Sequence, residues 1–115
     1  MKNRIKAFQV ALKGISTAIQ GELHMKIHLL ATCVCVVLGF ILHLSPLEWV
    51  AILFCIALVI VSELINTAIE LLCNKIHPDY DLDIGKVKDI SSGAVLFASI
   101  ISAIIGLIIF LPKLF

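Results

Sequence analysis

The stretch WVAILFCIALVIVSELINTAIELLC, residues 49–73, decides the fold, because it is long and apolar and yet contains two glutamates and an asparagine. No charged residue occurs between Trp49 and Ser62, and the helical pattern continues through Glu63 and Glu70. About 20 residues of helix, each rising ~1.5 Å, cross the ~30 Å hydrocarbon core of a bilayer. We therefore predict that residues 47–73 form a membrane-spanning helix that carries acids.

Two further apolar runs lie on either side of this segment. Charged residues are absent from Ile27 to Leu47 and from Ile90 to Pro112, which predicts spans over residues 27–44 and 86–111. The whole chain is 61% hydrophobic and 15% charged, with a mean hydropathy of +1.12, whereas soluble domains are roughly 45–50% apolar and about 25% charged. The sequence therefore predicts an all-α membrane protein with three transmembrane helices.

The N-terminal residues have a different pattern. Ile5, Phe8, Leu12, Ile15 and Ile19 recur at helical spacing, with lysines and polar residues on the opposite face. Residues 1–20 are predicted to form a basic amphipathic helix in the membrane interface. A soluble helix that packs on a partner is the alternative. Residues 74–85 are predicted to form a loop, and residues 1–115 a single domain.

The positive charges predict the orientation. Five of the nine lysines and arginines precede the first span and three lie between the second and third spans. Because basic loops stay in the cytoplasm, we expect a multi-pass protein of the cytoplasmic (inner) membrane with its N-terminus inside. The net charge of +1 gives no reason to expect a nucleic-acid partner.

Polar side chains of the second span share one helix face, namely Glu63, Asn66, Thr67, Glu70 and Asn74. An acid inside the membrane costs several kcal/mol unless it is paired, bound to metal or in contact with water, so it usually has a function. The alternative is that these groups only join helices through hydrogen bonds. That alternative suits Thr67 better than the two glutamates.

Further charged residues are expected at the cytoplasmic end, where the topology places Glu22, Glu70, Lys88 and Asp89. Glu22, Glu63 and Glu70 form a carboxylate trio that suits Mg²⁺, a hard cation that is usually shared with substrate phosphates. A snorkelling lysine and a solvated aspartate are the alternative for residues 88 and 89. A transition-metal pair of His24 and His28 is a weaker possibility. No phosphate-binding glycine loop of a soluble kinase occurs, so spacing alone predicts neither ATP nor kinase activity.

Three blocks of sequence resemble the prokaryotic diacylglycerol kinase family, which includes undecaprenol kinases. ELINTAIE at residues 63–70 resembles the signature E-x-x-N-[ST]-A-I-E, and GKVKD at residues 85–89 followed by GAVL resembles a second signature. Residues 22–28 resemble a third, weaker block. The blocks stand in the expected order, and the resemblance covers essentially the whole chain. The turn at residues 44–49 and the C-terminal segment are most similar to the undecaprenol kinase branch.

The resemblance implies an ATP-dependent kinase of a membrane lipid alcohol, either undecaprenol or diacylglycerol, that works as a homotrimer. Glu63 would be the general base, supported by Asn66, and Glu22 and Glu70 would hold Mg²⁺. The residues implied for the nucleotide are Asp79, Tyr80, Asp81, Lys88 and Asp89. Ser91 and Ser92 replace the commoner alanines, and Ser92 is expected to contact the lipid.

The sequence also leaves a non-enzymatic function open. A small membrane subunit or an ion-conducting module could also use a hydrated acidic seam. Acids along the whole length of the bundle would favour a pore. The cluster of Glu22, Lys88 and Asp89 at one end favours an enzyme.

Overall fold

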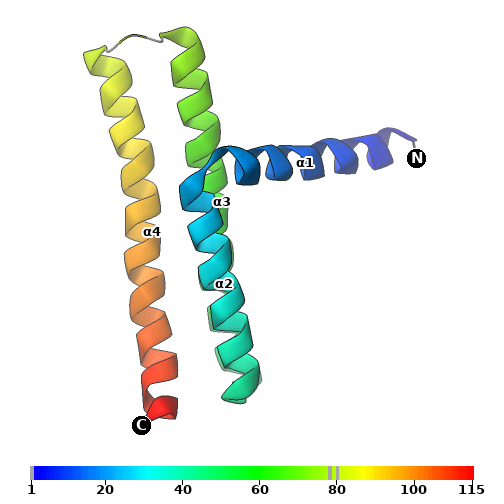
Figure 1. The fold of residues 1–115 in the computed structure, drawn as a ribbon, viewed down its shortest axis with the longest axis vertical. Coiled ribbons are helices and arrows are strands. Elements are labelled where there is room, and N and C mark those ends of the chain that lie inside the picture. Colours follow the sequence, from blue (N-terminus) through cyan, green and yellow to red (C-terminus); the bar gives the residue numbers. More distant parts are fainter. Residues whose placement is uncertain (1, 78, 80) are drawn as a thin grey trace.

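The computed structural model describes residues 2–77, 79 and 81–115. These residues form four helices: α1 (Lys2–Gly21), α2 (Leu23–Ile41), α3 (Pro46–Ile76) and α4 (Leu82–Leu114) (Figure 1). Helices α2, α3 and α4 are each long and apolar enough to cross a membrane. The structure therefore confirms the predicted all-α class with three membrane-crossing helices.

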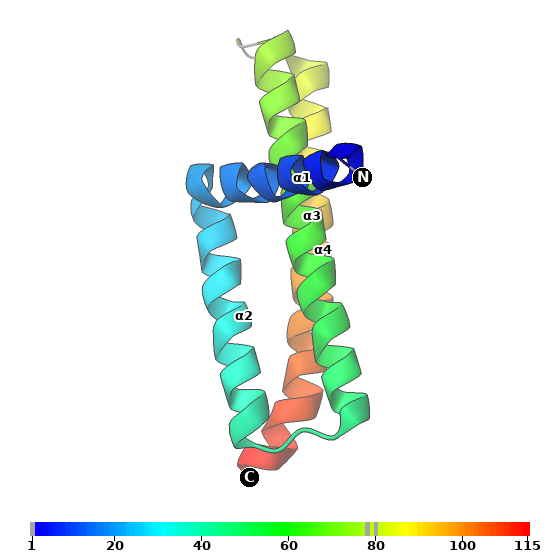
Figure 2. The same cartoon turned by 90° about the vertical axis from the view of Figure 1, so that its right-hand side faces the viewer.

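Helix α1 lies crosswise to the other three helices and extends away from them (Figures 1 and 2). It ends at Gly21, and Glu22 has an extended backbone with φ −126° and ψ 123°, so the chain turns sharply into α2. Ala18 is buried, and α1 contacts both α2 and α3. This orientation is the one expected of an amphipathic helix that lies along a membrane surface.

Helix α3 is the centre of the bundle. Helices α3 and α4 form a long antiparallel hairpin (Figure 1), and α2 also packs on α3. In the described chain, α2 and α4 do not pack closely on each other. This arrangement leaves a space between α2 and α4 that is closed on one side by α3.

Many large apolar side chains are exposed and several polar ones are buried, which is the opposite of the distribution in soluble proteins. Phe54, Phe97 and Ile108 are each about two-thirds exposed or more, whereas Glu63 is only 2% exposed. In a bilayer the exposed apolar side chains face lipid, and polar side chains are satisfied inside the bundle. This distribution fits the membrane assignment.

The connection between α2 and α3 is tightly built. The side chain of Ser45 accepts a hydrogen bond from the backbone N–H of Glu48, and the Glu48 carboxylate accepts one from the N–H of Ser45. This reciprocal cap, followed by Pro46 at the first helical position, fixes the start of α3. The end of the bundle near the α2–α3 connection is then closed by a small cluster of Leu44, Ile52 and Phe110.

The predicted loop over residues 74–85 is longer than the one observed. Helix α3 continues to Ile76, and α4 already begins at Leu82, so that Gly85 lies inside α4. The reason is the Asp81 carboxylate, which accepts hydrogen bonds from the backbone N–H groups of Asp83 and Ile84, each at 3.1 Å. An aspartate in this position starts a helix by satisfying its free N–H groups. Helix α2 likewise begins and ends earlier than predicted, at Leu23 and Ile41.

Candidate functional site

The polar face of α3 turns inward. Glu63, Asn66 and Thr67 are 2%, 7% and 5% exposed, while Glu70 is half-buried and Asn74 is exposed. These five residues lie on one face of the helix, as their spacing predicted. They form a seam that is buried at Glu63 and reaches solvent near Asn74.

Asn66 links two helices in the middle of this seam. Its side-chain oxygen accepts a hydrogen bond from the hydroxyl of Ser91 on α4 at 2.7 Å, and its amide nitrogen donates to Oε1 of Glu70 at 3.4 Å. The two bonds together define the orientation of the amide. The α4 helix thus positions Asn66, and Asn66 in turn positions Glu70.

Glu63 contacts the third helix of the bundle. Its Oε2 lies 3.5 Å from Nε2 of His28 on α2, and the two side chains are 3% and 21% exposed. The hydroxyl of Thr67 donates to the backbone carbonyl of Glu63 rather than to its carboxylate. The carboxylate therefore lies at the meeting of α2 and α3 with one oxygen toward His28.

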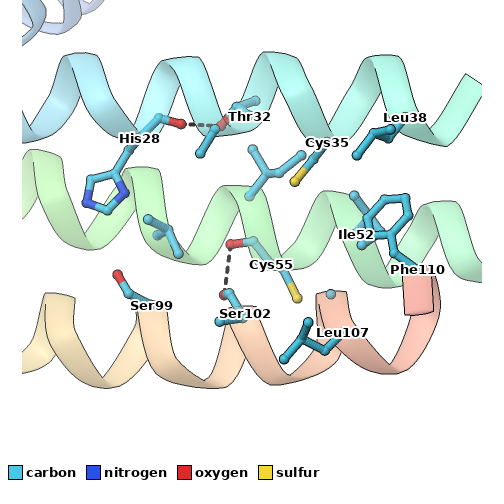
Figure 3. A pocket seen from close by; sticks show the side chains of 15 residues that line it. His28, Thr32, Cys35, Leu38, Ile52, Cys55, Ser99, Ser102, Leu107 and Phe110 are labelled. Atoms are coloured by element: carbon cyan, nitrogen blue, oxygen red, sulfur yellow. Dashed lines mark hydrogen bonds between the residues drawn. The ribbon is translucent and has the colours of Figure 1, made fainter. Parts of the chain in front are cut away.

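A cavity of about 460 Å³ occupies the space between α2, α3 and α4 (Figure 3). Its walls are mainly aliphatic, and small residues such as Ala31 and Ala103 keep it open. His28 stands at one end, and Phe110 belongs to the apolar cluster at the other. The cavity is thus an apolar groove, and His28, which contacts Glu63, lies at one end of it. We call this the inner end of the cavity.

The end of the seam near the α3–α4 connection carries positive charge. Lys88 on α4 donates a hydrogen bond to the side-chain oxygen of Asn74 on α3, and Asp89 is exposed beside it. Lys88 therefore stands at the solvent end of the same seam as Glu63.

The predicted carboxylate trio is not assembled by one chain. No group of three or more carboxylate, histidine or cysteine side chains within residues 2–77, 79 and 81–115 is placed to hold a metal ion. Glu22 lies at the corner between α1 and α2, whereas Glu63 is buried against His28. Histidines 24 and 28 likewise belong to no such group in this part of the chain.

Glu22 and Glu70 still have the donor chemistry that Mg²⁺ prefers. Mg²⁺ usually takes one or two protein carboxylates and completes its shell with waters and phosphate oxygens. Both glutamates are half-exposed, the side chain of Glu22 makes no capping hydrogen bond, and only Oε1 of Glu70 is bonded to Asn66. Each glutamate therefore has oxygen-donor chemistry that suits a hard cation such as Mg²⁺.

The other predicted ligand-binding residues lie in different places. Asp79 is exposed in the short connection, and its backbone carbonyl contacts Nδ1 of His77 at 2.8 Å. Asp81 uses one carboxylate oxygen to cap α4. Tyr80 lies outside the described residues. Ser92 is exposed on α4, while its neighbour Ser91 is buried against Asn66.

Two residues of the site were not identified as such from the sequence. The sequence presents His28 only as half of a histidine pair and as the last residue of the third family-like block, and Ser91 only as a departure from a family pattern. A signal existed for each: His28 is the first polar residue of an apolar run, and Ser91 lies one helical turn after Lys88 on α4. Neither signal says which neighbouring helix the side chain would contact.

Three membrane-crossing helices around a buried carboxylate, with a basic residue at the solvent end of the same seam, define an integral membrane protein whose site lies between lipid and water. Residues 9–110 match the sequence model of the prokaryotic diacylglycerol kinase family. The chain therefore belongs to that family, which confirms the predicted resemblance and makes it a lipid kinase. This result favours an enzyme over the alternative of a non-enzymatic subunit or ion-conducting module.

Two relatives illustrate the similarity. The chain is 40% identical over 114 residues to the undecaprenol kinase of Bacillus subtilis, an alignment that covers 95% of this chain and 89% of that protein. It is 31% identical over 100 residues to the diacylglycerol kinase of Escherichia coli, covering 87% of this chain and 82% of that protein.

Proposed function

We propose that this protein transfers the γ-phosphoryl group of ATP, with Mg²⁺, to the hydroxyl of a membrane lipid alcohol at the cytoplasmic face of the inner membrane. The observation that supports this most is the position of Glu63. Its carboxylate is buried in the bundle at 2% exposure, and it contacts His28 at the inner end of an apolar cavity. A base in this place suits a substrate that cannot leave the membrane.

The cavity suits the hydrocarbon part of such a substrate. Its lining is mainly aliphatic, and it runs from His28 toward Phe110 at the outer end of the bundle (Figure 3). A hydrocarbon chain in this groove would bring its hydroxyl to the level of Glu63. Ser92, which is exposed on α4, is a further proposed lipid contact.

Glu63 is proposed to act as the general base. The lipid hydroxyl oxygen attacks the γ-phosphorus, its proton passes to the Glu63 carboxylate, and the bond from the γ-phosphorus to the oxygen of departing ADP breaks. Asn66 supports this arrangement from one turn along α3, because Ser91 and Glu70 fix its amide. Positioning and charge neutralisation supply most of the catalysis in phosphoryl transfer.

Charged residues at the cytoplasmic end are proposed to receive the nucleotide. Glu22 and Glu70 would hold Mg²⁺, which neutralises phosphate charge when it is bound. Lys88 places an ammonium group beside Asn74 and would contact the phosphates. Asp89 and the connection that contains Asp79, Tyr80 and Asp81 would contact the rest of the nucleotide.

We also propose a homotrimer with its N-terminus in the cytoplasm. One chain leaves the seam open, and apolar side chains such as Leu72, Ile76 and Ile90 are exposed near the cytoplasmic ends of α3 and α4. A neighbouring subunit would cover such side chains and supply further walls for the nucleotide. The family resemblance supports three subunits.

Undecaprenol is the preferred acceptor in this proposal, and diacylglycerol is the second. The higher identity to an undecaprenol kinase, 40% against 31% for a diacylglycerol kinase, favours this order. Initial rates on the two lipids in mixed micelles, with one enzyme preparation, test it. A faster rate on undecaprenol is expected, and phosphorylation of neither lipid would contradict the function.

A further inference from the structure

His28 has two neighbours of opposite character. On one side its Nε2 lies 3.5 Å from Oε2 of Glu63. On the other side it lines the inner end of the apolar cavity, where Figure 3 shows the imidazole entering from α2 and the Ser99 side chain from α4. The ring therefore lies between the groove and the carboxylate.

Few other side chains contact the carboxylate of Glu63 and could fix its orientation. Among residues 2–77, 79 and 81–115, His28 is the one side chain in ion-pair or hydrogen-bond contact with it. Thr67, one turn further along α3, uses its hydroxyl for the backbone carbonyl of Glu63. Glu63 is only 2% exposed. If one of its carboxylate oxygens is to accept a proton from the substrate, another group must hold the second oxygen in place.

We propose that His28 is a positioning residue for Glu63, holding Oε2 through an N–H at Nε2 so that Oε1 faces the lipid hydroxyl that arrives from the groove. This inference rests on the proposed function, because it assigns a task to the partner of the proposed base. The 3.5 Å contact is long for a hydrogen bond, and contacts of catalytic groups commonly tighten when the substrate binds. An oriented partner of this kind is usually worth about 10- to 100-fold in activity.

The alternative is that His28 only joins α2 to α3. A joining role predicts a loss of stability with unchanged turnover of the surviving protein. A positioning role predicts a loss of kcat with little change in the KM for ATP, because the nucleotide residues lie toward the other end of the seam. The two roles therefore separate in one set of kinetic and stability measurements.

The experiment uses the full chain in mixed micelles with undecaprenol. His28→Leu should lower kcat about 10- to 100-fold, and His28→Gln, whose amide can still donate a hydrogen bond, should recover most of that loss. His24→Leu is the matched control, because His24 is exposed one turn earlier on the same helix. It should leave kcat unchanged. Thermal denaturation of each variant shows whether it is folded.

A double variant tests the inference even if His28→Leu alone lowers the stability of the protein. In the Glu63→Gln background, His28→Leu should cause no further loss of kcat, because the carboxylate that it would position is gone. Equal losses in both backgrounds would overturn the inference and leave the proposed function intact. Wild-type kcat for His28→Leu would overturn it as well. A wild-type protein that phosphorylated neither undecaprenol nor diacylglycerol would overturn the proposed function, and the inference with it.

Discussion

The hydroxyl of Ser91 on α4 donates a 2.7 Å hydrogen bond to the side-chain oxygen of Asn66 on α3, and both residues are buried. This bond joins the two longest helices at the level of the seam. It also leaves the Asn66 amide nitrogen pointing to Glu70, at 3.4 Å from Oε1. A residue of the third span thus controls the geometry of the second.

Ser91→Ala should lower the free energy of unfolding by about 0.6–2 kcal/mol, because an interhelical hydrogen bond is lost and the Asn66 oxygen is left buried. Unfolding of the detergent-solubilised protein measures the change. Ser92→Ala is the matched control, since Ser92 is the exposed neighbour on the same helix, and its stability should stay close to wild type. Equal losses in the two variants would argue against the Asn66 contact.

Glu63→Gln should reduce kcat by about 10²–10⁴, the usual contribution of a general base, while ATP affinity changes little. The fold should be as stable as wild type or more stable, because a buried acid is replaced by a neutral amide of the same shape. Both quantities are measurable on one preparation. Near-normal kcat together with lowered stability would assign Glu63 to helix packing.

Glu70→Gln should weaken the use of Mg²⁺ and ATP and leave the fold intact, because it removes a hard-cation ligand without changing size. The measurement is initial rate against Mg²⁺ and ATP concentration. Glu48→Gln serves as the control, because Glu48 lies in the first turn of α3, far along the helix from Glu70, where its Oε1 pairs with Lys113 at 3.1 Å. If Glu70→Gln shifted neither curve, Glu70 would not be a ligand.

Gly39→Ala should destabilise the bundle by about 1–3 kcal/mol, the usual cost of overpacking. A Cβ at residue 39 would lie 2.6 Å from Cη2 and 2.9 Å from Cζ2 of Trp49, so the indole ring would have to move. Trp49 is the single tryptophan of the chain, so its fluorescence reports the displacement directly. Gly106→Ala is the control, because a Cβ there meets no atom within 4 Å, and it should cause neither effect.

Reporter fusions at the two ends should be found on opposite sides of the membrane, with the N-terminus inside. Three helices long and apolar enough to cross a membrane predict this, together with the basic residues before α2 and around the α3–α4 connection. The measurement compares two reporters at each end of the chain, one that is active only in the cytoplasm and one that is active only outside it. A cytoplasmic C-terminus would contradict the three-span topology.

The fold was predictable because its main signals are local. Uncharged runs of membrane length gave the three spans, and the reciprocal cap of Ser45 and Glu48 follows from adjacent residues. The start of α4 differs from the prediction, because the Asp81 cap begins the helix at Leu82, before Gly85. Spacing also placed Glu63, Asn66 and Thr67 on one face, since a helix has a fixed period.

The contacts of that face were not predictable in the same way. Whether Ser91 or Ser92 points to Asn66 depends on the rotation of α4 about its own axis, and residue spacing within one helix does not contain that angle. The contact of His28 with Glu63 depends on how α2 and α3 are aligned along their lengths. Both are set by packing between helices, so they became visible only in three dimensions.

The seven-residue separation of Glu63 and Glu70 along α3, about 10 Å of helix, has a consequence for kinetics. The acceptor of a lipid kinase diffuses in two dimensions, and its relevant concentration is the number of molecules per unit area of bilayer. The phosphoryl donor is a solute in three dimensions. At constant amounts of protein and acceptor lipid, adding inert phospholipid should therefore slow the reaction by surface dilution, whereas adding buffer that keeps the ATP and Mg²⁺ concentrations constant should not. For such an enzyme, the rate saturates with the mole fraction of the lipid acceptor in the bilayer and with the molar concentration of the phosphoryl donor in water.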